Sequence, residues 1–574
     1  MRNILDVLCD QAQKALKIVA GGDILPEITP STQPQFGHYQ CNNSLKLAKQ
    51  LQSNPRSIAQ KIIDAWPQDL PEMIAKMEIA GPGFINIFLT TEYITDEINR
   101  VFHDARLGVS PPKTMQRIIV EFSSPNIAKE LHVGHLRSTI IGDSLARLFE
   151  FLGHDVLRLN HIGDWGTQFG MLITYMRDIV PDVLEGKVAA DLTSLMQWYR
   201  ESKKRFDEDP EFKKRSQLQV VKLQGGDEVA LAAWQMICDI SKQSYHQIYQ
   251  LLDVKLLDRG ESFYNPYLPE VIVDLEKRSM ITLSDGAKCI YLDGYVNREG
   301  EPLPIIIQKS DGGYNYDTTD MAGFRHRIEV EKADRIIVVT DAGQALHFEM
   351  IAKAVEKAGY LDPKKVRFDH VPFGVVLGAD GKKFKTRSGD TERLIDLLLE
   401  AIDHAKKLLQ ERIPDLPDLD HTAQVLGIDA VKYADLSSHR IKDYVFSYDR
   451  MLRFEGNTAA FLLYAYVRVQ SIKRKIGKPL PTTGSIQLTH PTELDLALHL
   501  RQFGETLDSM AEELLPNRLA EYLYTTAEKF HAFFRDCRVE GAPEEESRLL
   551  LCEVTGRILH QGLQILGLKT LDKM

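Results

Sequence analysis

The stretch 117–152 constrains this chain more than any other. It reads RIIVEFSSPNIAKELHVGHLRSTIIGDSLARLFEFL. The β-branched run 118–120 is typical of a buried strand, and Pro125 follows as a breaker because proline cannot donate to a sheet ladder. The apolar residues of 136–152 then follow a helical spacing, and Gly153 favours a helix stop. The sequence therefore predicts a strand, a loop and a helix in that order.

The segment His132-Val133-Gly134-His135 falls where the predicted loop passes into the predicted helix. Free backbone N–H groups and the positive end of the helix dipole make such a position a natural phosphate site. Gly134 allows a nucleotide to lie close to the backbone, with an imidazole on either side. The alternative is that both histidines are surface or capping residues. We predict that His132, Gly134 and His135 bind the phosphates of a nucleotide.

The run Ser-Ser-Pro-Asn at 123–126, followed by His-Val-Gly-His-Leu-Arg-Ser at 132–138, resembles the signature of arginyl-tRNA synthetases, a class I family. The resemblance implies an α/β plus all-α chain. Its parts are a Rossmann-type catalytic domain with the HxGH element, a small N-terminal α/β domain and a C-terminal helical anticodon-binding domain. It also implies that the chain activates L-arginine with ATP to arginyl-adenylate and pyrophosphate. Transfer of arginine to the 3′-terminal adenosine of tRNA(Arg) then follows.

Length and composition are compatible with such an enzyme. A chain of 574 residues has room for three or four domains. We place an N-terminal tRNA-binding (D-loop) domain at 1–110, the catalytic domain at 113–405 with a helical insertion at about 180–260, and the anticodon-binding domain at 415–574. The 44% apolar and 26% charged residues are those of a globular protein.

The charge and the cysteines narrow the function classes. A net charge of −11 argues against indiscriminate nucleic-acid binding, although local basic patches remain compatible with it. The six cysteines are scattered without any C-x-x-C, so we expect neither a structural zinc nor disulfides. No stretch approaches the ~20 apolar residues of a membrane span. We expect a cytoplasmic monomer that does not contact a membrane.

The N-terminal part reads as a small α/β module. Residues 44–64 predict two helices around Ser-Asn-Pro, and 79–87 predict a Gly-Pro-Gly turn that feeds a strand. The family resemblance implies contact with the D-loop corner of the tRNA, in which Phe84 stacks on a nucleotide and Asn86 reads its edge. The alternative is that Phe84 belongs to the core.

A second predicted strand at 155–160 completes a βαβ unit of Rossmann type. The glycine-rich block 161–170 comes next, at the edge where such sheets bind nucleotides, and Trp165 is placed to form a wall of the site. Residues 180–260 are helical and heavily charged, which is typical of a solvated insertion, and we assign them no chemistry.

Further strands are predicted near 289–292, 304–307 and 335–339, and polar residues at strand ends of an open α/β sheet hold ligands. A guanidinium has donors and no acceptor, so its pocket needs carboxylates and carbonyls. We favour Asp320 with Tyr316 for the guanidinium, while the choice between carboxylates for this group and for the α-amino group stays open. Each residue taken singly has the alternative of an ordinary helix cap or polar strand end. The resemblance assigns arginine binding to Glu121, Ser124, Pro125, Asn126, His135, Tyr316, Asp320 and Gln344.

The segment 373–389 is a second chemical block, a glycine-punctuated loop with four cations in 382–387. A mobile cationic loop beside a phosphate site can close over ATP and neutralise the leaving pyrophosphate. It corresponds to the KMSKS loop of class I synthetases, with Lys385 and Arg387 as its cations. Thr386 replaces the second lysine, and Lys129 is the expected substitute. We expect Mg²⁺ with the ATP and no other metal; the alternative for the loop is a solvated basic turn.

The C-terminal part is predicted to be helical throughout. Between 430 and 478 it has ten basic and four acidic residues, with aromatic residues interleaved. Cations for phosphates and rings for unstacked bases are what a single-stranded RNA loop requires. The resemblance to the family's anticodon-binding domain assigns tRNA contacts to Asn457, Tyr464 and Arg468.

Two other functions have been weighed. A nucleotidyltransferase of the HxGH superfamily would use the same histidine pair on ATP, but such enzymes are much shorter and lack a basic helical domain. The second alternative is a synthetase-like RNA-binding or regulatory protein without catalytic activity. The intact His132, Gly134 and His135, together with the cationic loop, argue against it.

Overall fold

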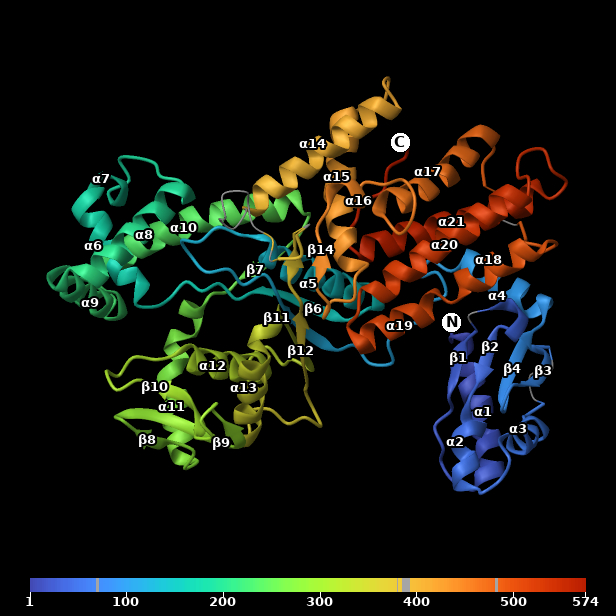
Figure 1. The fold of residues 1–574 in the computed structure, drawn as a ribbon, viewed down its shortest axis with the longest axis horizontal. Coiled ribbons are helices and arrows are strands. Elements are labelled where there is room, and N and C mark those ends of the chain that lie inside the picture. The colour runs from blue at the N-terminus through green and yellow to red at the C-terminus, as the bar shows by residue number, and fades with distance from the viewer. Residues whose placement is uncertain (32, 69–71, 379, 383, 385–392, 481–483) are drawn as a thin grey trace.

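The computed structural model describes every residue except 32, 69–71, 379, 383, 385–392 and 481–483. Three parts are visible in Figure 1: an N-terminal module, a central parallel sheet with its attached segments, and a C-terminal set of helices. None of the described helices is both long and apolar enough to cross a membrane. The predicted combination of an α/β part and an all-α part is confirmed.

The N-terminal module packs helices against a four-stranded antiparallel sheet of order β1-β2-β4-β3. The two helices predicted around Ser-Asn-Pro are confirmed as α2 and α3, and the Gly-Pro-Gly turn joins β3 to β4. The elements are α1 (Ile4–Ala20), β1 (Ile28–Pro30), a 3₁₀ turn (Pro34–Phe36), β2 (Tyr39–Cys41), α2 (Asn43–Gln50), α3 (Pro55–Asp64), β3 (Ile74–Ala80), β4 (Phe84–Leu89) and α4 (Thr91–His103).

The centre of the chain is a five-stranded, fully parallel sheet of order β12-β11-β5-β6-β7. Ile118, Ile119 and Val120 in its middle strand have no exposed surface, as expected for a parallel sheet covered on both faces. The predicted βαβ unit is confirmed as β5, α5 and β6. The sheet and its first helix comprise β5 (Arg117–Glu121), α5 (Val133–Leu152), β6 (Asp155–Asn160), β7 (Leu257–Asp258), β11 (Arg335–Asp341) and β12 (Arg367–Phe373).

Helix α5 ends where the sequence predicts. Gly153 adopts φ 102°, a left-handed conformation, and its N–H donates to the carbonyl of Phe149. Glycine suits this position because it has no Cβ to clash.

Two segments are attached to the sheet. The charged insertion predicted at about 180–260 is helical, with α7 (Pro181–Leu184), α8 (Leu192–Glu208), α9 (Pro210–Gln224) and α10 (Glu228–Leu251), and a further helix, α6 (Gln168–Ile179), precedes it. The strands predicted near 289 and 304 form, but they belong to a separate antiparallel sheet of order β10-β9-β8 rather than to the parallel one. That second segment comprises a 3₁₀ helix (Glu261–Tyr267), α11 (Leu268–Lys277), β8 (Thr282–Ser284), β9 (Ala287–Val296), β10 (Pro302–Gln308), α12 (Tyr316–Glu329), a 3₁₀ turn (Ala342–Gln344) and α13 (Ala345–Lys357).

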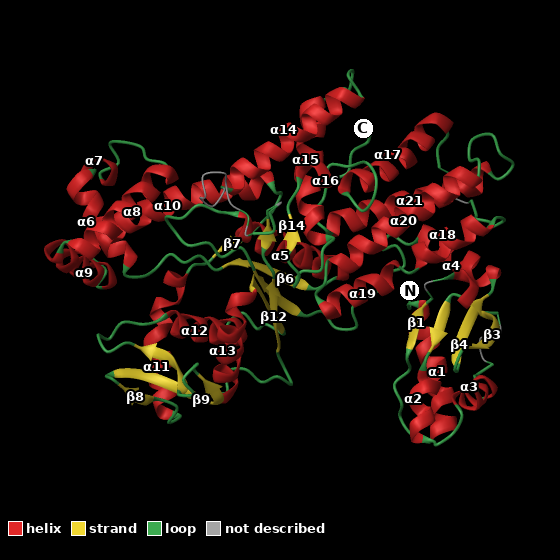
Figure 2. Cartoon of the chain, in the orientation of Figure 1, coloured by secondary structure: helices red, strands yellow, loops and turns green. Residues whose placement is uncertain are grey.

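The C-terminal part is almost entirely helical (Figure 2). The prediction of helix throughout is wrong at one point, because β14 (Tyr444–Val445) pairs in parallel with β13 (Val376–Leu377) of the catalytic part. The helices are α14 (Leu394–Arg412), which leads into this part, then α15 (Leu419–Leu436), α16 (Tyr448–Met451), α17 (Ala459–Ile476), α18 (Pro491–Arg501), α19 (Phe503–Glu513), α20 (Asn517–Asp536) and α21 (Glu545–Ile565).

Candidate active site

The HxGH element forms the first turn of α5. His132 is the N-cap, and its Nδ1 accepts from the N–H of Gly134 at 3.0 Å. The backbone N–H of His132 in turn donates to Nδ1 of His135 at 3.1 Å. Both histidines therefore cap the helix, which was the alternative reading, but capping uses only one nitrogen of each ring. Because each Nδ1 is an acceptor, each neutral ring carries its proton on Nε2.

Burial and nearby charge keep both rings neutral. Burial, followed by the proximity of His132 and Lys129, lowers the pKa of His135 to about 3. Burial and Lys129 also lower the pKa of His132. The two ring centroids lie 4.1 Å apart. The turn thus presents two uncharged N–H donors at a helix N-terminus, which suits phosphate oxygens.

Gly134 is required by the His132 ring. A Cβ on residue 134 would lie 2.8 Å from Cε1 and 3.0 Å from Nδ1 of His132. Any side chain would therefore displace the imidazole from its capping position.

The loop between β5 and α5 is conformationally strained. Ser123, Ser124 and Ala128 have φ values of 71°, 47° and 59°, a region that residues with a Cβ rarely adopt. Such strain persists only where the surroundings hold the backbone, and it concentrates at functional sites.

Helix α10 of the insertion supplies that support. The Tyr249 hydroxyl lies 2.7 Å from Oγ of Ser123, and the Tyr245 hydroxyl donates to the carbonyls of Asn126 and Lys129. Both tyrosines are buried. The sequence analysis assigned the insertion no chemistry, and nothing in its local pattern marks these two residues.

A cavity of about 870 Å³ lies against this loop and the first turn of α5. Pro125 lies beneath it, buried, with its carbonyl accepting from the N–H of Gly163 at 3.0 Å. Lys129 is exposed in the same loop, outside the described cavity wall. Trp165, predicted to form a wall of the site, instead packs edge-on against Trp234 of α10, at 5.7 Å between ring centroids. The predicted residues that line the cavity are Glu121, Ser124, Asn126, His132, Gly134, His135, Tyr316, Asp320 and Gln344.

The far wall of this cavity does not come from strand ends alone. Tyr316 and Asp320 lie in the first two turns of α12, so their predicted placement at the end of a sheet strand is wrong. The loop after β10 leads directly into that helix, which brings both residues to the cavity. Gln344 does follow a strand, because its 3₁₀ turn comes directly after β11.

His347 of α13 occupies the acidic wall. Its Nε2 lies 2.6 Å from Asp320 and its Nδ1 3.3 Å from Asp317. Burial alone would lower its pKa, but the hydrogen bonds to Asp317 and Asp320 outweigh burial and raise it to about 9. An imidazolium therefore lies where the sequence analysis placed a guanidinium. The sequence analysis missed His347, although its spacing from Gln344 places both on one face of a helical turn.

Two further carboxylates face the cavity. Glu121 forms a buried ion pair with Arg327 at 2.5 Å. Burial, followed by repulsion from Asp320 and Asp164, raises the pKa of Glu261 to about 8. Glu261 was also missed, since it opens a short 3₁₀ helix far from every motif in the sequence.

The cationic loop is only partly described. Lys385, Thr386 and Arg387 lie outside the described residues. The segment before them packs on the C-terminal part, where the rings of Phe384 and Phe446 are 5.1 Å apart. The segment after them returns to the HxGH element, because the N–H of Leu394 donates to the carbonyl of Leu131 at 2.8 Å.

The sequence matches three family models in order. They are the arginyl tRNA synthetase N-terminal domain at residues 6–89, the catalytic domain of class I (R) tRNA synthetases at 97–448, and the DALR anticodon binding domain at 462–574. The chain belongs to the arginyl-tRNA synthetase family. The resemblance drawn from the HxGH element is thereby confirmed.

Relatives of this synthetase match it over nearly its full length. The arginine–tRNA ligase of Protochlamydia amoebophila is 60% identical, with 100% of both chains covered, and that of a Nostoc species is 52% identical, covering 96% of this chain and 95% of its own. Among solved structures, Plasmodium falciparum arginyl-tRNA synthetase is 34% identical with a TM-score of 0.88. Thermus thermophilus arginyl-tRNA synthetase is 25% identical with a TM-score of 0.82, and each covers 100% of both chains.

The predicted tRNA contacts of the synthetase's N-terminal module differ in accessibility. Phe84 is half-buried at the start of β4. Asn86 is only 3% exposed, and its Oδ1 accepts from Gln40 at 2.8 Å. A base contact by Asn86 would require Gln40 to move.

The predicted contacts of the helical domain lie just before α17 and in its first half. Tyr464 is 38% exposed, and the Arg468 guanidinium lies between its ring and that of Phe534, at 4.7 and 4.8 Å from the two centroids. Asn457 is exposed and accepts from the Tyr433 hydroxyl. Not all ten basic residues between 430 and 478 can face RNA. Lys432 is only 1% exposed and donates to backbone carbonyls.

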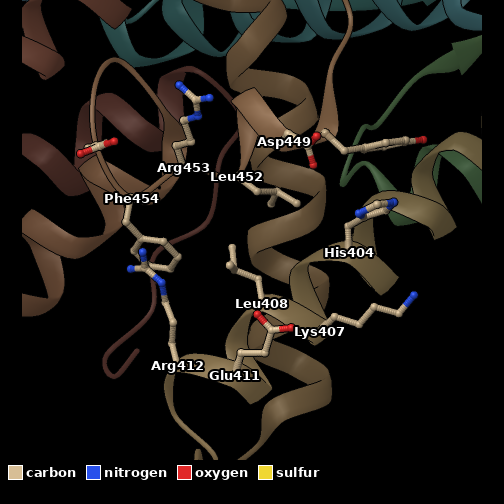
Figure 3. A pocket seen from close by; sticks show the side chains of 11 residues that line it. His404, Lys407, Leu408, Glu411, Arg412, Asp449, Leu452, Arg453 and Phe454 are labelled. Atoms are coloured by element: carbon tan, nitrogen blue, oxygen red, sulfur yellow. The ribbon is translucent and has the colours of Figure 1, made fainter.

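A second cavity of about 850 Å³ lies between α14 and the α16 segment of the synthetase (Figure 3). The Arg412 guanidinium covers the Phe454 ring at 4.3 Å, and the His404 and Tyr448 rings stack at 4.8 Å. Figure 3 shows Arg453 and Lys407 extending from opposite walls. The rings and the three cations suit a nucleic-acid strand, but the carboxylates of Glu411, Asp449 and Glu455 line the same cavity and balance their charge.

Among the described residues, no cluster of three or more His, Cys, Asp or Glu side chains is arranged to hold an ion. The six cysteines all carry free thiols.

Proposed function

We propose that this chain is an arginine–tRNA ligase. It activates L-arginine with ATP to arginyl-adenylate and pyrophosphate, then transfers arginine to the 3′-terminal adenosine of tRNA(Arg). The observation that carries the proposal is the shared cavity, in which the HxGH turn faces a wall of carboxylates from other segments. Phosphate donors and guanidinium acceptors are what the two substrates require on either side of one reaction centre.

In the first step, an oxygen of the arginine α-carboxylate attacks the α-phosphorus of ATP. A bond forms between them as the bond from the α-phosphorus to the pyrophosphate oxygen breaks. The carboxylate is already ionised at neutral pH, so no general base is needed. Catalysis consists of positioning and charge stabilisation, in which the Nε2–H groups of His132 and His135 donate to phosphate oxygens. Lys385 and Arg387, with Lys129, neutralise the leaving pyrophosphate.

The acidic wall selects arginine. Asp320 and Glu261, with Tyr316, take the guanidinium, which then replaces the imidazolium of His347 as the counter-charge of Asp320. Glu121, Ser124, Asn126 and Gln344 remain for the α-amino and carboxylate groups, with Pro125 shaping the loop. A substrate that lacks the guanidinium leaves buried acceptors unpaired, so the pocket rejects it by a factor of ~10⁴. A separate editing site is then unnecessary.

In the second step, a ribose hydroxyl of the terminal adenosine attacks the carbonyl carbon of the adenylate. An ester forms as the acyl–phosphate bond breaks and AMP leaves; class I membership assigns the 2′-OH. The tRNA lies along the helical domain, where Asn457, Tyr464 and Arg468 contact unstacked bases. Phe84, with Asn86 behind it, meets the D-loop corner.

ATP enters as its Mg²⁺ complex, so the ion belongs to the substrate rather than to a resident site. We propose a monomer that acts in the cytoplasm, in agreement with six free thiols in a reducing compartment.

The proposal is tested by arginine-dependent exchange between ATP and labelled pyrophosphate, measured with and without tRNA(Arg). Exchange that appears only with tRNA is the expected result. Exchange without tRNA would keep the enzyme and refute the requirement for tRNA. Absence of exchange with every amino acid would indicate a catalytically inactive synthetase-like protein. Adenylyl transfer to a small nucleotide would indicate a nucleotidyltransferase.

A further inference from the structure

Arg137 joins three segments of the chain at a buried point. It lies on α5, two residues after His135, and has no exposed surface. Its Nε lies 3.1 Å from the carboxylate of Asp435 on α15. Its Nη1 donates to the carbonyl of Gly374, at 2.7 Å, and to that of Lys442, at 3.2 Å. One guanidinium on the HxGH helix thus contacts the start of the cationic loop and the segment 435–442, which leads into the helical domain.

The start of the cationic loop is also held by the segment 440–446, which leads into the helical domain. The N–H of Gly374 donates to the carbonyl of Arg440 at 2.9 Å, and the N–H of Val375 donates to the carboxylate of Asp443 at 2.7 Å. Strands β13 and β14 then pair. A Cβ at Gly374 would lie 2.8 Å from the carbonyl oxygen of Ile441. The two backbones are therefore too close to slide past one another.

Helix α15 is bound at a second buried point to two other segments. Nζ of Lys432, three residues before Asp435, donates to the carbonyl of Leu252, after α10, at 2.7 Å and to that of Gly567, after α21. A Cβ at Gly567 would meet Asp143 of α5 at 2.8 Å and Lys432 at 3.1 Å. The residues after α21 therefore pack between α15 and α5, which connects the end of the helical domain with the helix of the histidines.

Stability alone does not account for the Arg137–Asp435 pair. A buried ion pair is commonly no more stable than apolar residues of the same volume, because both charges lose their water. Here one guanidinium nitrogen, Nη2, has no hydrogen-bond partner among the described residues. What the pair does achieve is a fixed geometry between segments that carry the two halves of the phosphate site.

We propose that Arg137 is a positioning residue that couples tRNA binding by the helical domain to adenylation. It does so by holding the HxGH turn and the start of the cationic loop in a fixed relative position. The inference rests on the proposed function. When tRNA binds α16 and α17, the segment 437–446 and α15 move together. Arg137 transmits that movement to His132 and His135 on one side and to Gly374 and β13 on the other.

The test compares Arg137→Lys with a matched control, Arg501→Lys. Arg501 is equally buried, and its Nε donates to Glu97 at 2.6 Å. That pair joins the helical domain to the N-terminal module and lies outside the cavity. Each variant is assayed for melting temperature, for tRNA(Arg) affinity and for pyrophosphate exchange at saturating tRNA.

We expect Arg137→Lys to bind tRNA(Arg) within about twofold of wild type but to lose about 100-fold in the kcat of exchange, the scale for a misplacement of about 1 Å. Arg501→Lys should show a similar change in melting temperature and keep its kcat. Asp435→Asn, which preserves shape, should lose kcat as Arg137→Lys does. The double variant should lose no more than either single one, because both remove the same link.

An Arg137→Lys variant that exchanges at the wild-type rate would overturn the coupling, as would an equal loss in Arg501→Lys. A loss of tRNA affinity that matches the loss of kcat would also overturn it. If Arg137→Lys does not fold, Asp435→Asn carries the same expectation. Absence of exchange in the wild type refutes the proposed function itself, whereas wild-type exchange with an unaffected Arg137→Lys refutes only the coupling.

Discussion

Glu261→Gln tests a carboxylate of the arginine pocket whose raised pKa favours the protonated form in the free enzyme at neutral pH. Burial, with Asp320 and Asp164 nearby, raises the pKa of Glu261 to about 8. A guanidinium binds the ionised form, so arginine must displace this proton when it enters. Glutamine has the same shape and models the neutral form at every pH.

The size of the pH effect on arginine binding follows from the pKa of Glu261. About one Glu261 in a hundred is ionised at pH 6, roughly one in ten at pH 7 and one in two at pH 8. The ratio of the wild-type to the Glu261→Gln association constant for arginine should therefore rise about tenfold from pH 6 to pH 7, and about fivefold from pH 7 to pH 8. Taking the ratio cancels the titration of arginine itself and of His347.

Calorimetry in buffers of different ionisation enthalpy counts the protons directly. At pH 7 the wild type should release about 0.9 proton more per bound arginine than Glu261→Gln. A ratio that stays flat across this range, with equal proton release by both proteins, would refute the assignment of Glu261 to the guanidinium. If the ratio of association constants stays constant with pH but the variant binds arginine more weakly, Glu261 is ionised over the whole range from pH 6 to pH 8.

Three further outcomes are expected. His135→Ala should slow adenylate formation by roughly 10²–10³, the scale for one preorganised donor, and an unchanged exchange rate would remove this residue from the site. Asp320→Ala should raise the KM for arginine far more than that for ATP, whereas equal increases would indicate general unfolding. His347 has a folded pKa of about 9, above its unfolded value of about 6.5. Its stabilisation is thus complete below pH 6.5 and lost as pH rises through 9. The melting temperatures of wild type and His347→Gln should therefore converge between pH 6 and pH 10, and a constant difference would contradict the ion pair with Asp317 and Asp320.

Elements with a strong local signal were predictable from the sequence. The β-branched run before Pro125 and the spacing after His135 specified strand, loop and helix, because these patterns follow from backbone geometry within a few residues. Gly153 ended α5 for the same reason. The two-residue strand β14 was not predictable, since Tyr444 and Val445 form it only by pairing with β13, a segment almost 70 residues earlier.

Some residues of the candidate active site were predictable from the sequence and others were not. Glu121, Ser124, Asn126, Tyr316, Asp320 and Gln344 were identified by resemblance, and they line one cavity with the HxGH turn. Glu261 and His347 line it too, but their role depends on charges from α12 that no local pattern contains. The support of Ser123 by Tyr249 crosses from the insertion to the catalytic loop, which is a long-range contact.

The sequence by itself determined the family, the order of the parts and the chemistry of the HxGH turn, because each depends on residues close together in the chain. Only the tertiary structure decided the protonation of the site and the connection between its halves. The pKa values of Glu261 and His347 depend on burial and on carboxylates from separate segments. The contacts of Arg137 join residues 137, 374, 435 and 442, which come together only when the helical domain packs on the sheet.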